Sequence, residues 1–133
     1  MKKSSYKLTV RGYELDSFGH VNNSVYLQYA EAAMWHFFKT SGLLDVMKAE
    51  EVSPVILEST QRYMHELKLL DEVRIESEFS CSNGILSYRH NIINQATDLV
   101  SCKVKGKLAY INKEHVICDV PDGIRDYIKG EIK

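Results

Sequence analysis

One eighteen-residue stretch, Asn23–Thr40, constrains the fold of this chain more than any other feature. Its few polar side chains form one rough stripe, and apolar or aromatic residues fill the rest of the circumference. A helix that is apolar over most of its surface is normally buried, and eighteen residues span about 27 Å at 1.5 Å per residue. The sequence therefore predicts a long central helix that other elements cover on several sides. Gly42 is expected to end it, because glycine readily adopts the left-handed backbone found after a helix.

Strand patterns lie on both sides of this helix in the chain. Residues Tyr6–Tyr13 begin with the alternation of a half-buried strand. Four more strands are expected at Val55–Glu66, Glu72–Ser82, Ile85–Gln95 and Val100–Asn112, a short helix at Leu43–Glu50, and a weak helix within Val116–Lys133. Turn signals at 82–84 and 94–98 favour antiparallel neighbours. This order predicts an α+β fold, in which an antiparallel sheet of about five strands curls around the central helix.

The size and charge of the chain exclude several classes of protein. Its 133 residues fit a single domain over 1–133. Seventeen basic against eighteen acidic residues leave no charge signature for nucleic acid or an anionic membrane. No apolar run approaches the roughly 20 residues of a membrane span, so we expect a cytoplasmic protein. One sheet face leaves part of the central helix bare, and we therefore also expect a homodimer or homotetramer.

No common cofactor or metal motif is present. The chain lacks GxGxxG, the P-loop, HExxH and GxSxG patterns. Its five histidines do not fall at paired ligand spacing, and Cys81, Cys102 and Cys118 form no CxxC. We expect reduced thiols, no metal site and no cofactor.

The polar loop before the central helix is the candidate site. The first turn of the helix presents backbone N–H groups without internal partners, which bind oxyanions or polarise carbonyls. The candidates for the N-cap are Asn22, Asn23 and Ser24. Asp16 lies six to eight residues upstream, on a loop that Gly19 allows to fold back. A carboxylate beside such a helix end is a candidate group for acyl transfer.

Each of these residues also has a plain structural interpretation. Asp16 could simply form a turn or cap, and His20 could hydrogen-bond the backbone. Glu31, on the helix, is more commonly a solvated or ion-paired residue than a base. Spacing alone leaves these alternatives open.

A longer motif is more specific. Residues 11–33 read RGYELDSFGHVNNSVYLQYAEAA, and residues 62–78 read RYMHELKLLDEVRIESE. Together they closely resemble the 4-hydroxybenzoyl-CoA thioesterase family of hot-dog folds. The resemblance extends over nearly the whole chain to about Asn112, and it implies hydrolysis of an acyl-CoA or acyl-carrier-protein thioester at a subunit interface.

The resemblance also implies roles for individual residues. Asp16 would be the catalytic carboxylate, either attacking the thioester carbonyl or activating water. The backbone N–H of Asn23 would polarise that carbonyl, and His20 would support the site. The residues expected around the substrate are Gly19, Val21, Asn22 and Tyr26. Other hot-dog thioesterases use a carboxylate within the helix, which makes Glu31 the alternative to Asp16.

Two features depart from this pattern or extend it. The chain has His65 and Glu66 where relatives often have proline, so either could be a second polar group near the site or an exposed edge residue. The nucleotide of CoA needs cations, and Arg89 and Lys105, with Lys103 and Lys107 nearby, are candidates. The alternative for these cations is a solvated strand face.

Two rival functions remain at this stage. The same fold could serve as a non-catalytic acyl-thioester binding module, or as a hydratase or dehydratase. A binding module is expected to lack the loop carboxylate, and the dehydratase relatives resemble motifs with different spacing.

Overall fold

The architecture is a curled antiparallel sheet packed against one long helix in a computed structural model that describes residues 1–130. In chain order the elements are β1 (Lys2–Thr9), the 3-10 turn η1 (Gly12–Glu14), α1 (Asn23–Thr40), α2 (Leu43–Glu50), β2 (Ser53–Tyr63), β3 (Glu72–Ser82), β4 (Ile85–Asn94), β5 (Val100–Ile111), β6 (Ile117–Cys118) and α3 (Asp122–Lys129). The end of the expected C-terminal helical segment, 131–133, lies outside the described residues.

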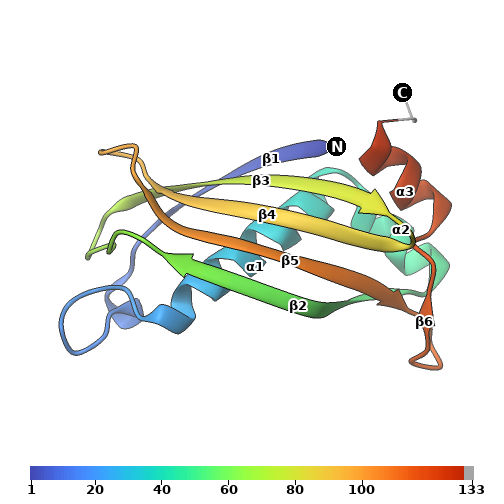
Figure 1. Ribbon diagram of the computed structural model, residues 1–133, viewed down its shortest axis with the longest axis horizontal. Coiled ribbons are helices and arrows are strands. Elements are labelled where there is room, and N and C mark those ends of the chain that lie inside the picture. Colours follow the sequence, from blue (N-terminus) through green and yellow to red (C-terminus); the bar gives the residue numbers. More distant parts are fainter. Residues whose placement is uncertain (131–133) are drawn as a thin grey trace.

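The sheet has the strand order β1-β3-β4-β5-β2, and the short β6 pairs with β5. Every pairing is antiparallel. In Figure 1 the sheet lies in front and α1 runs diagonally behind it. Strands β1 and β2 form the two edges, so β2 and β3 are consecutive in the chain without being neighbours. Residues 64–71 connect them across one end of the sheet, beside the start of α1.

Several predicted boundaries are confirmed and others are wrong by a few residues. The ranges of α1, α2 and β3 agree with the sequence analysis. The first strand, expected at Tyr6–Tyr13, instead spans Lys2–Thr9, because Gly12–Glu14 turns away as a 3-10 helix. Strand β2 ends at Tyr63 rather than Glu66. Strand β6 was not expected, since two residues give no periodicity.

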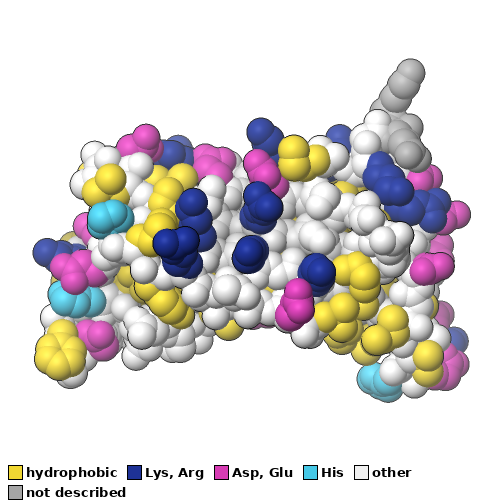
Figure 2. Space-filling model, viewed as in Figure 1, with side chains coloured by type: hydrophobic (Ala, Val, Ile, Leu, Met, Phe, Trp, Pro, Cys, Tyr) yellow, Lys and Arg dark blue, Asp and Glu magenta, His cyan; other side chains and the backbone are white. Residues whose placement is uncertain are grey.

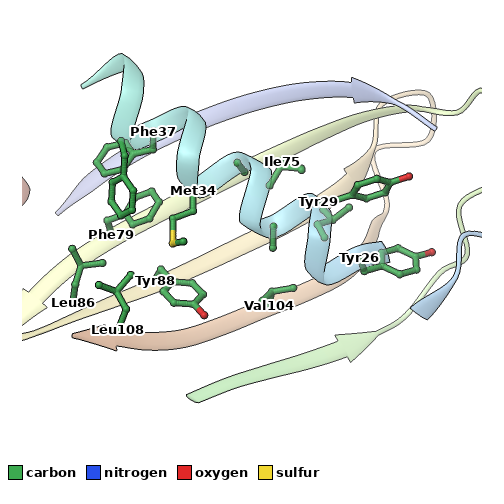
Figure 3. Packing of buried hydrophobic residues seen from close by; sticks show 14 of the residues in the cluster. Tyr26, Tyr29, Met34, Phe37, Ile75, Phe79, Leu86, Tyr88, Val104 and Leu108 are labelled. Atoms are coloured by element: carbon green, nitrogen blue, oxygen red, sulfur yellow. The ribbon is translucent and has the colours of Figure 1, made fainter. Parts of the chain in front are cut away.

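The core lies between α1 and the concave face of the sheet. Figure 3 shows Phe37 of α1 beside Phe79 of β3, whose rings are stacked 4.0 Å apart. Not all of α1 is covered: Leu27 is 41% exposed and Trp35 is 39% exposed. The helix is therefore central to the fold, but one side of it remains open in the single chain.

Candidate functional site

A buried carboxylate shapes the loop that leads into α1. Glu14 is only 6% exposed, and its side chain accepts hydrogen bonds from Arg11 Nη2 at 2.7 Å and from the Tyr29 hydroxyl at 2.7 Å. Burial alone would raise the pKa of Glu14, but the Arg11 and Tyr29 bonds outweigh it and hold the pKa below its ordinary value. The backbone carbonyl of Glu14 also accepts from Asn22 N–H at 2.9 Å. Glu14 thereby holds both ends of the loop.

Asp16 occupies a tight turn within this loop. Its Oδ1 accepts hydrogen bonds from the N–H groups of Phe18 at 2.9 Å and His20 at 3.2 Å. Gly19 completes the turn with φ of +80°, a conformation that suits glycine. Asp16 Oδ2 accepts no hydrogen bond within residues 1–130. The expected turn-forming role and a free carboxylate oxygen therefore coexist in one side chain.

The N-terminus of α1 is capped by Asn22, one of the three expected candidates. Its Oδ1 accepts from Ser24 N–H at 3.1 Å, and its carbonyl accepts from Val25 N–H at 2.9 Å. In the described part of the chain, Asn23 N–H, at the first helical position, has no hydrogen-bond partner. This free N–H lies at the positive end of an eighteen-residue helix.

These groups meet in one depression, the Asp16 cavity, of about 240 Å³. Its lining residues are Asp16, His20, Val21, Asn23, Tyr26, Tyr63, Met64, His65 and Glu66. Two segments far apart in the sequence thus form one site: the loop before α1 with the start of that helix, and the end of β2 with the residues 64–66 that follow it.

Contacts across the Asp16 cavity join these two segments. His20 Nε2 lies 3.1 Å from Glu66 Oε2. The Tyr63 hydroxyl donates to the Asn23 carbonyl at 3.1 Å. The Tyr26 hydroxyl accepts from Leu67 N–H at 3.0 Å, and burial raises the pKa of this phenol. The polar groups are therefore held in place before any substrate binds.

The alternative carboxylate lies in a different depression. Glu31 borders what we call the apolar cavity, of about 180 Å³, between α1 and the sheet. Its lining residues are Leu27, Ala30, Glu31, Met34, Ile56, Ser59, Tyr88, His90 and Val104. No residue lines both cavities, so Asp16 and Glu31 offer two separate sites rather than one carboxylate pair.

Arg89 and Lys105, the cations expected to bind the CoA nucleotide, line a different depression from Asp16. Arg89 and Lys105 are register partners on β4 and β5, and they alternate with the inward-facing Tyr88 and Val104. Figure 2 shows basic side chains gathered over the middle of the outer sheet face. With Lys3 and Lys103 they line a depression of about 480 Å³ on that face. One chain therefore does not bring Arg89 or Lys105 into the Asp16 cavity.

Sequence reasoning missed two parts of this site. Glu14 and Tyr29 interact across fifteen positions, and no local pattern signals such a pair. Tyr63 falls within an expected strand and shows no sequence signal of its own, yet its hydroxyl contacts the helix N-terminus. His65 and Glu66, which depart from the family pattern, both line the Asp16 cavity.

No metal centre is visible in the described residues. Within residues 1–130, no group of three or more His, Cys, Asp or Glu side chains is placed to hold a metal ion. Among these residues, no helix is long and apolar enough to cross a membrane.

Comparison with known proteins decides the family. The sequence model of the "Thioesterase-like superfamily" matches residues 10–128, nearly the whole chain. This chain belongs to the thioesterase-like superfamily. The match is to the superfamily, and membership of the narrower 4-hydroxybenzoyl-CoA thioesterase family stays a prediction.

The chain is also similar to individual known proteins. The chain is 30% identical over 125 residues to protein THEM6 of Xenopus laevis, covering 93% of this chain and 58% of that protein. It is 33% identical over 78 residues to the long-chain acyl-CoA thioesterase FadM of Escherichia coli, covering 59% of each. The chain thus spans about three fifths of the length of these relatives.

The fold is also shared with solved structures of thioesterases. The 1,4-dihydroxy-2-naphthoyl-CoA thioesterase from Synechocystis superposes with a TM-score of 0.86, over 96% of both chains, at 12% identity. Such low identity supports the fold alone, and with the superfamily match it confirms the expected hot-dog architecture.

Proposed function

We propose that this chain hydrolyses an acyl thioester of CoA or acyl carrier protein, with the Asp16 cavity as its active site. The observation that carries the proposal is that Asp16 and Asn23 line one depression, and that within residues 1–130 Asp16 Oδ2 and Asn23 N–H have no hydrogen-bond partner. Superfamily membership and the acyl-CoA thioesterase FadM among its relatives support the same chemistry.

The proposed reaction uses Asn23 N–H and the Asp16 carboxylate in turn. The carbonyl oxygen binds at Asn23 N–H, where the helix dipole stabilises the oxyanion formed on attack. One such donor contributes roughly 2.7 to 4 kcal/mol to the transition state. The tetrahedral intermediate then collapses, the carbon–sulfur bond breaks, and the thiolate leaves with the electron pair. The products are the free acid and the thiol.

Asp16 supplies the attack by one of two routes. As a general base, its Oδ2 takes a proton from water while the water oxygen bonds to the carbonyl carbon. As a nucleophile, Oδ2 bonds to that carbon itself, and water later hydrolyses the anhydride. Hydrogen bonds to Oδ1 orient the carboxylate in both cases. Neither route calls for a metal or a cofactor, because a thiolate is a good leaving group.

The neighbouring groups have supporting roles in this proposal. His20 and Glu66 lie against each other at the cavity wall, where they keep the Asp16 turn fixed to the end of β2. Tyr26 and Val21 line the path of the substrate. Asn22 caps the helix by accepting from Ser24 N–H, which leaves Asn23 N–H available to the substrate.

We also propose that the active form is a homodimer or homotetramer. Strand β2 is a free sheet edge, and the exposed apolar residues beside it lie on α1 and β2 and include Leu27, Trp35, Ile56 and Leu57. A second copy would extend the sheet and cover this side of α1. A role for Arg89 and Lys105 in binding the CoA nucleotide then requires a site formed with another subunit.

The test is release of free thiol from a panel of acyl-CoA substrates, measured with a thiol-trapping dye. Replacing the general base or nucleophile in Asp16→Asn is expected to lower kcat by about 100-fold or more. The matched control is Glu31→Gln, which removes the other candidate carboxylate and is expected to leave kcat within a few fold.

The other outcomes separate the rival functions. No thiol release from any chain length by the wild type would reject the enzyme and favour a binding module. Full activity in Asp16→Asn with loss in Glu31→Gln would move the site to the apolar cavity. Conversion of enoyl-CoA into the 3-hydroxy product without thiol release would favour the hydratase.

A further inference from the structure

Tyr29, in the second turn of α1, is a core residue that makes one polar contact. The side chain is buried, and its ring lies edge-on to that of Tyr26 with 6.3 Å between the centroids. Figure 3 shows both rings on the first half of α1. The Tyr29 hydroxyl donates to Glu14 Oε1 at 2.7 Å. A tyrosine on the helix therefore reaches back to the loop that precedes the helix.

The phenol is the donor in this bond because Glu14 is ionised. Burial would raise the pKa of Glu14, but its contacts with Arg11 and Tyr29 hold that pKa below the ordinary value. Burial and the bond to Glu14 raise the pKa of Tyr29, so the phenol keeps its proton. Hydrogen bonds to an ionised group are stronger than those between neutral groups. The contact between these two side chains is therefore a firm one.

Only one of the contacts of the Glu14 side chain joins the loop to the helix. Within residues 1–130 its partners are Arg11 and Tyr29. Arg11 binds locally, through its main-chain N–H at 2.8 Å and through its guanidinium, from three residues away. Tyr29 is fifteen residues away, about 9 Å along α1 from Asn23 at 1.5 Å per residue. The Tyr29 contact therefore fixes Glu14 against the rigid element that also carries Asn23 N–H.

Main-chain hydrogen bonds transmit this position from Glu14 to Asp16. The Glu14 carbonyl accepts from Asn22 N–H at 2.9 Å, and Asp16 N–H donates to the His20 carbonyl at 2.7 Å. An antiparallel bridge lies between these two bonds, so the loop is a narrow hairpin. Asp16 follows Glu14 by two residues in this hairpin. A shift of Glu14 relative to α1 would therefore shift the Asp16 carboxylate as well.

The separation between Asp16 and Asn23 N–H is what the reaction depends on. The carboxylate lies on the loop, whereas the N–H group belongs to the helix, so a contact between loop and helix sets their separation. Displacement of a reacting group by about 1 Å can cost roughly 100-fold in rate. Neither Glu14 nor Tyr29 is among the described residues that line the Asp16 cavity. Their influence on the reaction is therefore indirect.

We propose that Tyr29 is a positioning residue, which holds the Asp16 carboxylate at its reactive distance from Asn23 N–H through the hydrogen bond to Glu14. The inference rests on the proposed thioesterase function, and it adds to that function a residue that does not contact the substrate. The aromatic ring packs the core, and the hydroxyl aligns the site. Removing the hydroxyl alone separates these two roles.

The first test is the variant Tyr29→Phe, which keeps the buried ring. In the thiol-release assay we expect kcat to fall by about tenfold to 100-fold with KM within about threefold, because the lost alignment acts at the transition state. The matched control is Tyr110→Phe. Tyr110 is also fully buried, and within residues 1–130 its hydroxyl has no hydrogen-bond partner, so this variant should keep the wild-type kcat. Unchanged kcat in Tyr29→Phe, or an equal loss in both variants, would overturn the inference.

A double-mutant cycle distinguishes positioning from a general loss of structure. The residual rate of Asp16→Asn depends on Asn23 N–H, which is part of the helix and does not need the loop. Adding Tyr29→Phe to Asp16→Asn is therefore expected to lower kcat by no more than about twofold. The same loss in both backgrounds would show that Tyr29 does not act through Asp16. Glu14→Gln weakens the same bond by removing its charge, and it carries the test if Tyr29→Phe does not fold.

Hydrogen exchange separates this inference from the proposed function. In Tyr29→Phe the amides of Asp16 and Asn22 are expected to exchange about tenfold faster, because the hairpin is no longer held to α1. The amides of the central strand β4 should be unchanged, and Tyr110→Phe should match the wild type throughout. If these loop amides exchange faster but no thioester is hydrolysed, the enzyme proposal fails and the link through Tyr29 stands. Unchanged loop amides would reject the link even in an active thioesterase.

Discussion

Three buried or half-buried polar side chains on this chain illustrate how contacts decide the behaviour of single residues. Glu14 is charged in the core because Arg11 and Tyr29 hydrogen-bond to it, and the same contact together with burial raises the pKa of Tyr29. Asp16 forms a turn through Oδ1 and also lines a cavity. His90 has no charged partner, and burial keeps it neutral. Residue type alone would not distinguish these roles.

At this scale we predict that His90 makes stability depend on pH. Its pKa is about 4 in the folded chain against an ordinary 6.5, so the unfolded chain binds more protons between those values. Stability is therefore expected to be highest above pH 6.5 and to fall by about 3 kcal/mol as the pH drops through 4. Urea unfolding from pH 7.5 to 4.5 measures this loss.

The variant His90→Leu isolates the contribution of the histidine. Other groups near the ring are Tyr88 and Ser77 on the sheet and Glu31 on α1, and the variant retains all of them. The free energy of unfolding should decline less steeply below pH 6.5 in His90→Leu than in the wild type. Identical pH profiles would show that His90 does not carry this dependence.

At the level of elements, the start of α1 has both a structural and a proposed catalytic role. Asn22 caps the helix through its side chain while Asn23 N–H remains free. A capping side chain satisfies one orphan donor and leaves others available. The same end of the helix can therefore be stable and still bind an oxyanion.

We predict that Asn22→Ala destabilises the chain by about 1 kcal/mol, because the Ser24 N–H loses its acceptor. Asn22→Asp is the matched control, since its carboxylate can accept the same bond at the positive helix end and should cost little. Thermal or urea unfolding at neutral pH measures both variants. Equal stability of Asn22→Ala and the wild type would mean that water replaces the cap.

At the level of the whole molecule, the open side of α1 and the free edge of β2 fall on one continuous surface. Apolar side chains from both elements meet there around the mouth of the apolar cavity. Unpaired strand edges are commonly covered or blocked in stable proteins, and exposed apolar patches indicate interfaces. A second copy of the chain satisfies both requirements at once.

We therefore predict a particle of at least twice the chain mass of 15.3 kDa, measured by light scattering on a sizing column. The double variant Leu27→Lys and Ile56→Lys places charge on this surface and is expected to give monomers with reduced thioesterase activity. The control is Leu99→Lys, which alters an exposed leucine on the β4–β5 turn and should keep the wild-type mass. A monomeric wild type would contradict the proposed oligomer.

The sequence by itself determined the bounds of α1, α2 and β3, and it singled out Asp16 in the loop before α1 as a candidate residue. These features depend on local periodicity, on capping residues and on one motif, all of which are readable within about twenty residues. The first strand was placed too late because its first four residues, 2–5, are Lys and Ser and show no apolar alternation. Its end was missed because the turn at Gly12–Glu14 depends on the contacts of the buried Glu14.

Only the tertiary structure decided which groups share a cavity. Asp16, Asn23 and Glu66 line one cavity, whereas Glu31 lines another. Arg89 and Lys105 lie on the outer sheet face. His90 is hydrogen-bonded to Ser77. Each of these relations depends on strand order and register, which join residues distant in the chain. Hydrogen-bonded pairing between strands sets that geometry, and the sequence signals a partner only where a short turn joins two strands, as at 82–84 and 94–98.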